Sequence, residues 1–146
     1  MNATIEKFGY PATLLSEYEH WVVLLRPAQA TLGALVLAAR SDAEAFGDLP
    51  VGASTELARV TRDIELTLAQ LFGYDKINYL MLMMVDPHVH FHVLPRYAEA
   101  RHYRGCEFTD PGWPGPPRLD CQAAPDAEVF DALRLELLEA WPEVGR

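Results

Sequence analysis

Apolar runs separated by turn residues divide the first part of the chain into predicted strands and a helix. Residues 19–26 are rich in β-branched and aromatic side chains, and Pro27 closes this run. Residues 31–39 form a second apolar run after a short turn, so the two predict an antiparallel hairpin. Ser41, with Glu44 three positions on, is an N-cap pattern that predicts a short helix.

A long amphipathic helix is predicted over residues 54–72. Its apolar residues recur at spacings of three and four, which places them on one helix face: Leu57, Val60, Ile64, Leu68 and Leu71. Gly73 follows the last of them and is expected to end the helix as its C′ residue.

The next two strands are predicted to form a second hairpin. Residues 77–85 are a continuous apolar run of strand length, in which Met81, Met83 and Met84 are expected to fill the core. Asp86 and Pro87 predict a tight turn, after which residues 88–95 return beside the first strand.

The last third of the chain is expected to be irregular until a closing helix. Residues 110–117 contain too many Pro and Gly for a helix or a sheet interior, so they predict a loop, with Trp113 expected to pack over the body of the protein. Pro125 and Asp126 open the helix, whose apolar positions share one side: Val129, Phe130, Leu133, Leu137 and Trp141. The pattern predicts an α+β fold and a single domain over residues 1–146.

Composition narrows the classes of function. The chain has 146 residues, 50% of them hydrophobic and 23% charged, with no apolar run of membrane-spanning length. Its net charge of −9 argues against long nucleic acids as partners, although a small phosphorylated ligand needs only a local positive pocket. The first residues lack the order of a signal peptide, so the cytoplasm is the expected location. Cys106 and Cys121 are too few for a disulfide scaffold.

Three of the five histidines stand at alternate positions, His88, His90 and His92, separated by Val89 and Phe91. Successive side chains of a strand point to opposite faces, so the row is expected on one face and the apolar residues on the core. Imidazole has an unperturbed pKa near neutrality, which suits acid/base, nucleophilic or metal chemistry.

Several interpretations of the row are open. The histidines are either solvated surface residues, ligands of a metal ion, catalytic groups, or part of a nucleotide-binding site without turnover. Two histidines at i and i+2 reach one zinc ion, but three on a strand span about 13 Å, so a third ligand is expected elsewhere. The candidates for it are His20, His102, Asp86 and Glu107.

The catalytic interpretation assigns a role to each histidine. A neutral imidazole attacks a phosphoryl group and leaves it readily, which divides one displacement into two. The middle residue, His90, is the expected nucleophile because it has a histidine on each side. His88 and His92 are expected to bind phosphate oxygens or to assist proton transfer.

The sequence from His88 to Leu94, with Pro95 and Arg96 after it, resembles the signature of the histidine triad family. The resemblance covers about residues 17–97. It implies an antiparallel sheet with a long helix between the hairpin and the histidine strand, and a homodimer. It also implies a nucleotide hydrolase or nucleotidyl transferase that acts at the α-phosphate of a dinucleoside polyphosphate or phosphoramidate. The covalent nucleotidyl-histidine would form on His90, with no metal or cofactor required.

The chain departs from that family pattern in several places. Asp86 and Pro87 are predicted to join the strands directly, so the phosphate-contacting loop of the family is expected to be missing. Ala34 replaces a histidine of the upstream hairpin. Arg26 stands near the position of a ribose-contacting residue, and is expected either to meet an anion or to be a surface charge. The later basic residues are expected on the surface: Arg96, Arg101, His102 and Arg104.

Overall fold

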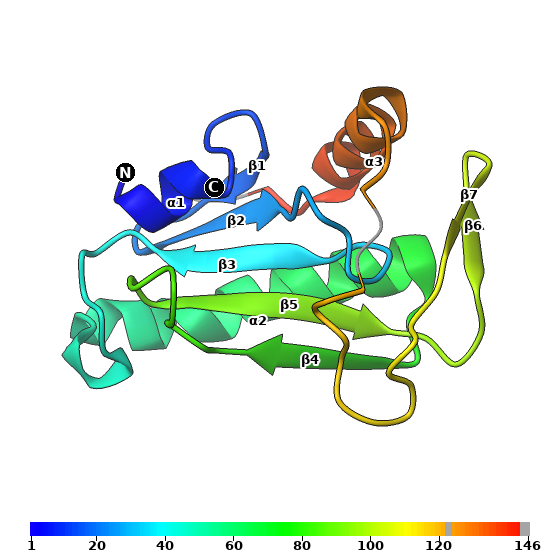
Figure 1. Cartoon of the computed structure of the whole chain (residues 1–146). Coiled ribbons are helices and arrows are strands. Elements are labelled where there is room, and N and C mark those ends of the chain that lie inside the picture. Colours follow the sequence, from blue (N-terminus) through cyan, green and yellow to red (C-terminus); the bar gives the residue numbers. More distant parts are fainter. Residues whose placement is uncertain (122–123, 144–146) are drawn as a thin grey trace.

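A computed structural model describes residues 1–121 and 124–143 (Figure 1). A five-stranded antiparallel sheet in the order β1-β2-β3-β5-β4 forms its centre, and β6 and β7 make a separate hairpin. The strands are β1 (Leu14–Glu17), β2 (Trp21–Leu25), β3 (Leu35–Ala39), β4 (Lys76–Leu80), β5 (His90–Arg96), β6 (Arg101–Tyr103) and β7 (Cys106–Phe108). The helices are α1 (Ala3–Lys7), α2 (Val51–Phe72) and α3 (Ala127–Ala140), with a 3-10 turn at η1 (Phe46–Asp48).

The main core lies between one face of the sheet and the helices α2 and α3. In Figure 1 α2 runs behind the sheet, and α3 lies beside the edge formed by β1. The predicted stripe of α2 is confirmed, since Val60, Ile64 and Leu68 are fully buried there. Gly73 ends α2 in the left-handed conformation, at φ 55°, as its position predicted. The helix begins earlier than predicted, at Val51. Only Ala53 is buried in its first turn, so no apolar stripe marked this turn in the sequence.

The opposite face of the sheet is covered at two places. The short helix α1 lies over it in Figure 1, and Ile5 packs against a small cluster of β2 and β3 side chains: Val22, Leu24, Val36 and Ala38. Farther along, Leu94 of β5 packs against Ala30 and Ala34, with Leu119 beside them. The histidines of β5 lie between these two covered areas.

The predicted two-residue turn between the last two strands is wrong. Strand β4 ends at Leu80, which pairs with His92, and β5 begins at His90, so residues 81–89 form a β4–β5 loop. Met83 has φ 46° in this loop, in the left-handed region where an extended strand cannot continue. Met84 and Val85 are 80% and 84% exposed, so the expected core role of Met84 is also wrong.

Other predictions differ in extent. The hairpin of β2 and β3 is confirmed in antiparallel register but is shorter than predicted, and the short helix after Ser41 is only the 3-10 turn η1. The closing helix α3 begins after Asp126, whose side chain accepts from the Val129 N–H. The segment after Arg96 is less irregular than predicted, because it contains the hairpin of β6 and β7. Within the described residues no helix is long and apolar enough to span a membrane.

Candidate functional site

Two of the three histidines lie together on the face that α1 covers. His90 and His92 occupy β5 opposite Ala38 and Val36, and their ring centroids are 5.1 Å apart. They are 2% and 7% exposed. Val93, which follows His92 in β5, lies on the other face of the sheet and is buried in the main core, as the alternation predicted. The prediction that the histidines share one strand face is therefore confirmed for His90 and His92.

His88 does not belong to the strand, which corrects the prediction of three consecutive strand histidines. It lies in the β4–β5 loop just before β5 and is half-buried. Its neighbour Val89 is tied to both sides of the sheet end, accepting from the Ala39 N–H and donating to the Ala43 carbonyl. These bonds hold the chain just before β5, and the His88 ring there contacts Thr4 of α1.

A backbone hydrogen bond fixes the His90 ring. Its Nδ1 lies 2.7 Å from the carbonyl oxygen of His88. A carbonyl oxygen only accepts, so Nδ1 carries the proton in this bond. In the neutral ring the lone pair is then on Nε2. Of the described residues, none makes a hydrogen bond to this second nitrogen.

His92 has the opposite arrangement. The Arg26 guanidinium donates through Nε to His92 Nδ1 at 3.3 Å. Arginine only donates, so Nδ1 accepts and the neutral His92 carries its proton on Nε2. Burial, followed by the charges of Arg26 and His90, lowers the pKa of His92 from 6.5 to about 4. His92 is consequently a neutral hydrogen-bond donor at physiological pH.

His88 is held by the first helix. Thr4 Oγ1 lies 2.9 Å from His88 Nδ1 and also accepts from the His88 backbone N–H at 3.3 Å. The Phe8 ring at the end of α1 contacts the other two histidines, with centroid distances of 5.7 Å to His90 and 5.9 Å to His92. The helix α1 is therefore part of the site.

A pocket of about 330 Å³ opens beside His90 and His92. Arg26 and Lys7 supply positive charge to its wall, and Lys7 makes a 2.6 Å ion pair with Asp86. The rest of the wall is mostly apolar and comes from α1 and the β4–β5 loop: Phe8, Leu82, Met83, Met84 and Val85. A loop thus stands where the sequence predicted a direct turn, and its apolar residues border the histidines.

The other candidate ligands of a metal ion lie apart from this pocket. His102 and Glu107 pair with each other across the exposed β6–β7 hairpin, 3.2 Å apart. His20 precedes β2 at the end of the sheet where β5 begins, but its ring lies beside Gly52 of α2, and its backbone N–H donates to Glu56. Asp86 lines the pocket but is paired with Lys7. Among residues 1–121 and 124–143, no three His, Cys, Asp or Glu side chains are grouped to hold a metal ion.

The expected surface cluster of basic residues after the triad is wrong for Arg96. This side chain is buried and bonds both carboxylate oxygens of Asp110, at 2.7 and 3.0 Å, as well as Asn78 and the Gly115 carbonyl. Arg101 is engaged too, because it donates to the carbonyls of Phe72 and Gly73 at the end of α2. Both arginines serve the fold, and Trp113 belongs to the loop that Arg96 anchors.

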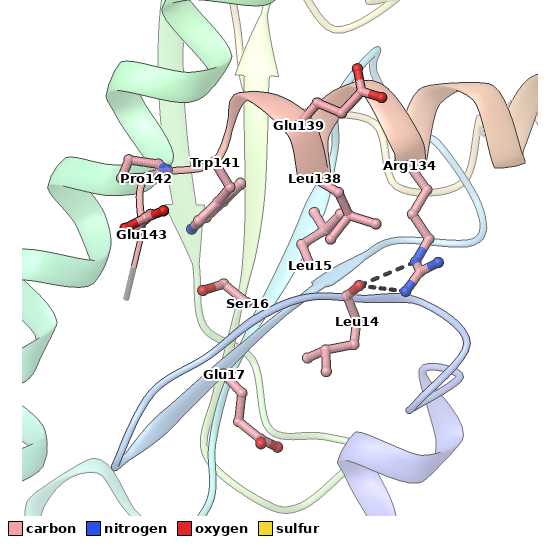
Figure 2. Close-up of a pocket in the computed structure, with 10 residues that line it drawn as sticks. All are labelled: Leu14, Leu15, Ser16, Glu17, Arg134, Leu138, Glu139, Trp141, Pro142 and Glu143. Atoms are coloured by element: carbon pink, nitrogen blue, oxygen red, sulfur yellow. Dashed lines mark hydrogen bonds between the residues drawn. The ribbon is translucent and has the colours of Figure 1, made fainter. Parts of the chain in front are cut away.

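A larger pocket, of about 620 Å³, lies between β1 and α3 (Figure 2). Figure 2 shows Arg134 reaching the Leu14 carbonyl, to which its Nε and Nη2 both donate at 3.1 and 2.9 Å. Ser16, Trp141 and three glutamates complete much of its lining: Glu17, Glu139 and Glu143. Among the residues that the structure describes, no histidine or cysteine lines this pocket, so the pocket at the histidines is the better candidate for chemistry.

Residues of the first helix are the part of the site that the sequence interpretation missed. A local signal was present, because Asn2 is a suitable N-cap and Ile5 and Phe8 are spaced as one helix face. Asn2 does cap α1, accepting from the Ile5 N–H. Nothing in the sequence places this helix against His88, since the contact joins residues 84 positions apart.

Comparison with known proteins gives structural neighbours only, since no protein-family model and no curated protein matches the chain. A histidine triad protein from Bradyrhizobium japonicum is 18% identical with a TM-score of 0.73, and the match covers 97% of each chain. One from Marinobacter aquaeolei is 24% identical with a TM-score of 0.71, covering 94% of this chain and 96% of the other. A protein from Sulfolobus tokodaii described as a hypothetical histidine triad nucleotide-binding protein is 19% identical, with a TM-score of 0.64 and coverage of 88% of this chain and 82% of the other.

These matches extend over nearly the whole chain, whereas the sequence resemblance ended near residue 97. They share the α+β architecture of an antiparallel sheet, a long helix and a closing helix. The chain therefore has the histidine triad fold, which confirms the resemblance read from His88, His90 and His92 at the level of the fold.

Proposed function

We propose that this protein is a nucleotide hydrolase or nucleotidyl transferase of the histidine triad family, with His90 as its nucleophile. The observation that carries the proposal is the 2.7 Å bond from His90 Nδ1 to the His88 carbonyl. This bond keeps the ring proton on Nδ1, so the lone pair of the neutral ring is on Nε2, and the ring lines the pocket. The description of the Sulfolobus tokodaii neighbour as a hypothetical nucleotide-binding protein is consistent with a nucleotide as the ligand.

The neighbouring groups suit a phosphate better than a neutral substrate. Arg26 brings a positive charge against His92, and Lys7 lines the same pocket in an ion pair with Asp86. We assign to His92 Nε2–H a hydrogen bond to a phosphoryl oxygen, which strengthens as negative charge develops there. His88 is assigned to hold His90 through its carbonyl group.

The reaction has two displacements at phosphorus. His90 Nε2 attacks the α-phosphorus, so a P–N bond forms and the bond to the leaving oxygen or nitrogen breaks. The leaving group takes up one proton. Water, or another acceptor, then attacks the same phosphorus, releases one proton and frees His90, so protons balance over the cycle.

Trapping the covalent intermediate tests the mechanism. The protein is mixed briefly with a nucleoside phosphoramidate or a dinucleoside polyphosphate, denatured in base because phosphohistidine bonds are labile in acid, and weighed intact. We expect a mass increase of one nucleotidyl group in the wild type and none in His90→Ala. The matched control is His102→Ala, a change at an exposed histidine on the β6–β7 hairpin, which should retain the adduct.

Two outcomes would contradict the proposal. An adduct and turnover that persist in His90→Ala would exclude this residue as the nucleophile. Saturable nucleotide binding by the wild type with no adduct and no turnover would make the protein a nucleotide-binding module instead.

The single domain and the homodimer stay predictions. Limited proteolysis tests the single domain, and light scattering tests the homodimer.

A further inference from the structure

We infer that Thr4 is a positioning residue of the histidine site, which acts on His90 through His88. Thr4 is 2% exposed, and its hydroxyl meets both the backbone N–H and the ring of His88. The next link is the bond from the His88 carbonyl to His90 Nδ1. The residues form a chain from α1 to the proposed nucleophile, and the kinetic part of this inference rests on the proposed function.

The hydrogen-bond roles in this chain follow from counting donors. Thr4 Oγ1 accepts from the His88 N–H, and its own hydroxyl hydrogen needs an acceptor because the group is buried away from water. His88 Nδ1, at 2.9 Å, is the acceptor within reach. The neutral His88 ring therefore carries its proton on Nε2, and His88 is held at three points: its N–H, its ring and its carbonyl oxygen.

The helix that carries Thr4 is itself anchored to the sheet. The Asn2 amide donates to the carbonyls of Ala39 and Ser41, both at 3.0 Å, where β3 ends. At the other end of α1, Lys7 pairs with Asp86, two residues before His88. These contacts fix the hydroxyl of Thr4 relative to the loop that brings His88 to β5.

Removal of the hydroxyl should loosen the His88 peptide and hence the bond that sets the His90 tautomer. Thr4→Val keeps the branched shape of the side chain and deletes only the hydrogen-bonding group. With the His88 carbonyl less well held, a smaller fraction of His90 has its lone pair on Nε2. We expect kcat to fall about tenfold, the effect of one lost hydrogen bond, with KM nearly unchanged because Thr4 does not line the pocket.

Two comparison variants separate this effect from a general loss of packing. Thr4→Ser restores a hydroxyl at the same position and should recover most of the lost kcat. Thr67→Val deletes another buried threonine hydroxyl, one that bonds the Asp63 carbonyl within α2, against the opposite face of the sheet. It should alter the melting temperature without altering kcat.

Nitrogen-15 NMR of the histidine rings gives a readout that needs no turnover. In the wild type we expect His90 protonated at Nδ1 and His88 at Nε2, and in Thr4→Val a mixed tautomer for His90. If His88 is protonated at Nδ1 in the wild type, the inference is overturned, even if the variant does not fold. Equal kcat and equal tautomers in Thr4→Val and wild type would also overturn it. If the wild type turns over no substrate, the proposed function fails while the NMR result still decides the role of Thr4.

Discussion

The two ends of β5 present polar side chains on the same face of the sheet, yet they are used differently. At one end His90 and His92 each have one ring nitrogen bonded and the other directed to no group among the described residues. At the other end the Arg96 guanidinium is bonded to Asp110, Asn78 and the Gly115 carbonyl. Both ends are buried, so burial alone does not distinguish chemistry from structure.

The difference lies in how completely the groups are satisfied. The Arg96 guanidinium makes four hydrogen bonds with its five N–H groups, and both Asp110 carboxylate oxygens accept from it, so this buried ion pair holds a loop in place. Buried rings with a nitrogen left over beside a pocket retain a donor or a lone pair for a substrate. Substitution at the histidine end of β5 should therefore reduce activity, and substitution of Arg96 should reduce stability.

Loss of the nucleophile should give the largest effect and should leave the fold intact. In His90→Asn the amide can still donate to the His88 carbonyl, but it cannot attack phosphorus. We expect turnover to fall by about 10⁴-fold or more, as for other enzymes that lose a nucleophile, with a small change in melting temperature. Steady-state kinetics and thermal unfolding measure the two effects. If the variant is unfolded at room temperature, His90 is needed for the fold as Arg96 is, which would contradict the difference between the two ends of β5.

Loss of Arg96 should have the reverse signature. The side chain of Asp110 is 1% exposed, so Arg96→Met leaves a buried carboxylate without its cation. We expect a loss of about 3–5 kcal/mol in the free energy of unfolding, measured by denaturant titration. The matched control is Arg118→Met, since Arg118 pairs with Asp120 with similar geometry but on the surface, where solvent screens the pair, and this variant should lose far less stability. Equal losses in the two variants would contradict the assigned role of Arg96.

Acid should weaken the histidine end in a defined pH range. The pKa of His92 is lowered to about 4 in the folded protein, so protons bind it more weakly there than in the unfolded chain, where it is near 6.5. The unfolded state then binds more protons between these values, and the free energy of unfolding falls as the pH falls from about 6.5 to 4. His92→Gln should flatten this part of the stability curve. A wild-type curve that matches that of the variant would contradict the shift.

The parts of the fold with a strong local pattern could be predicted from the sequence. The stripe ending at Gly73 gave α2, the capped apolar run after Asp126 gave α3, and the two apolar runs before Arg40 gave the hairpin of β2 and β3. The alternation of histidine with apolar residues also placed His90 and His92 correctly. In each case neighbouring residues in the chain decide the structure.

The errors arose where distant contacts override the local pattern. The apolar run after Leu80 looks like a strand, but the chain leaves the sheet after Leu80 and turns through the left-handed Met83. The ion pair of Asp86 with Lys7 ties this loop to α1. Arg96 looked like a surface charge because Asp110 is in a proline-rich segment with no strand pattern. Contacts of this kind join residues far apart in the chain, so no short window of sequence contains them.

The smallest predicted effect concerns the β4–β5 loop. This loop borders the histidine end of β5, and the segment bound by Arg96 borders the other end of the strand. Met84 is 80% exposed, so Met84→Ser should change the free energy of unfolding by less than about 0.5 kcal/mol at low protein concentration. Denaturant titration at several concentrations checks this value. A loss above about 2 kcal/mol that grows with concentration would show that a second copy of the chain covers the loop. The apolar wall of the histidine pocket would then belong to an interface as well as to the site.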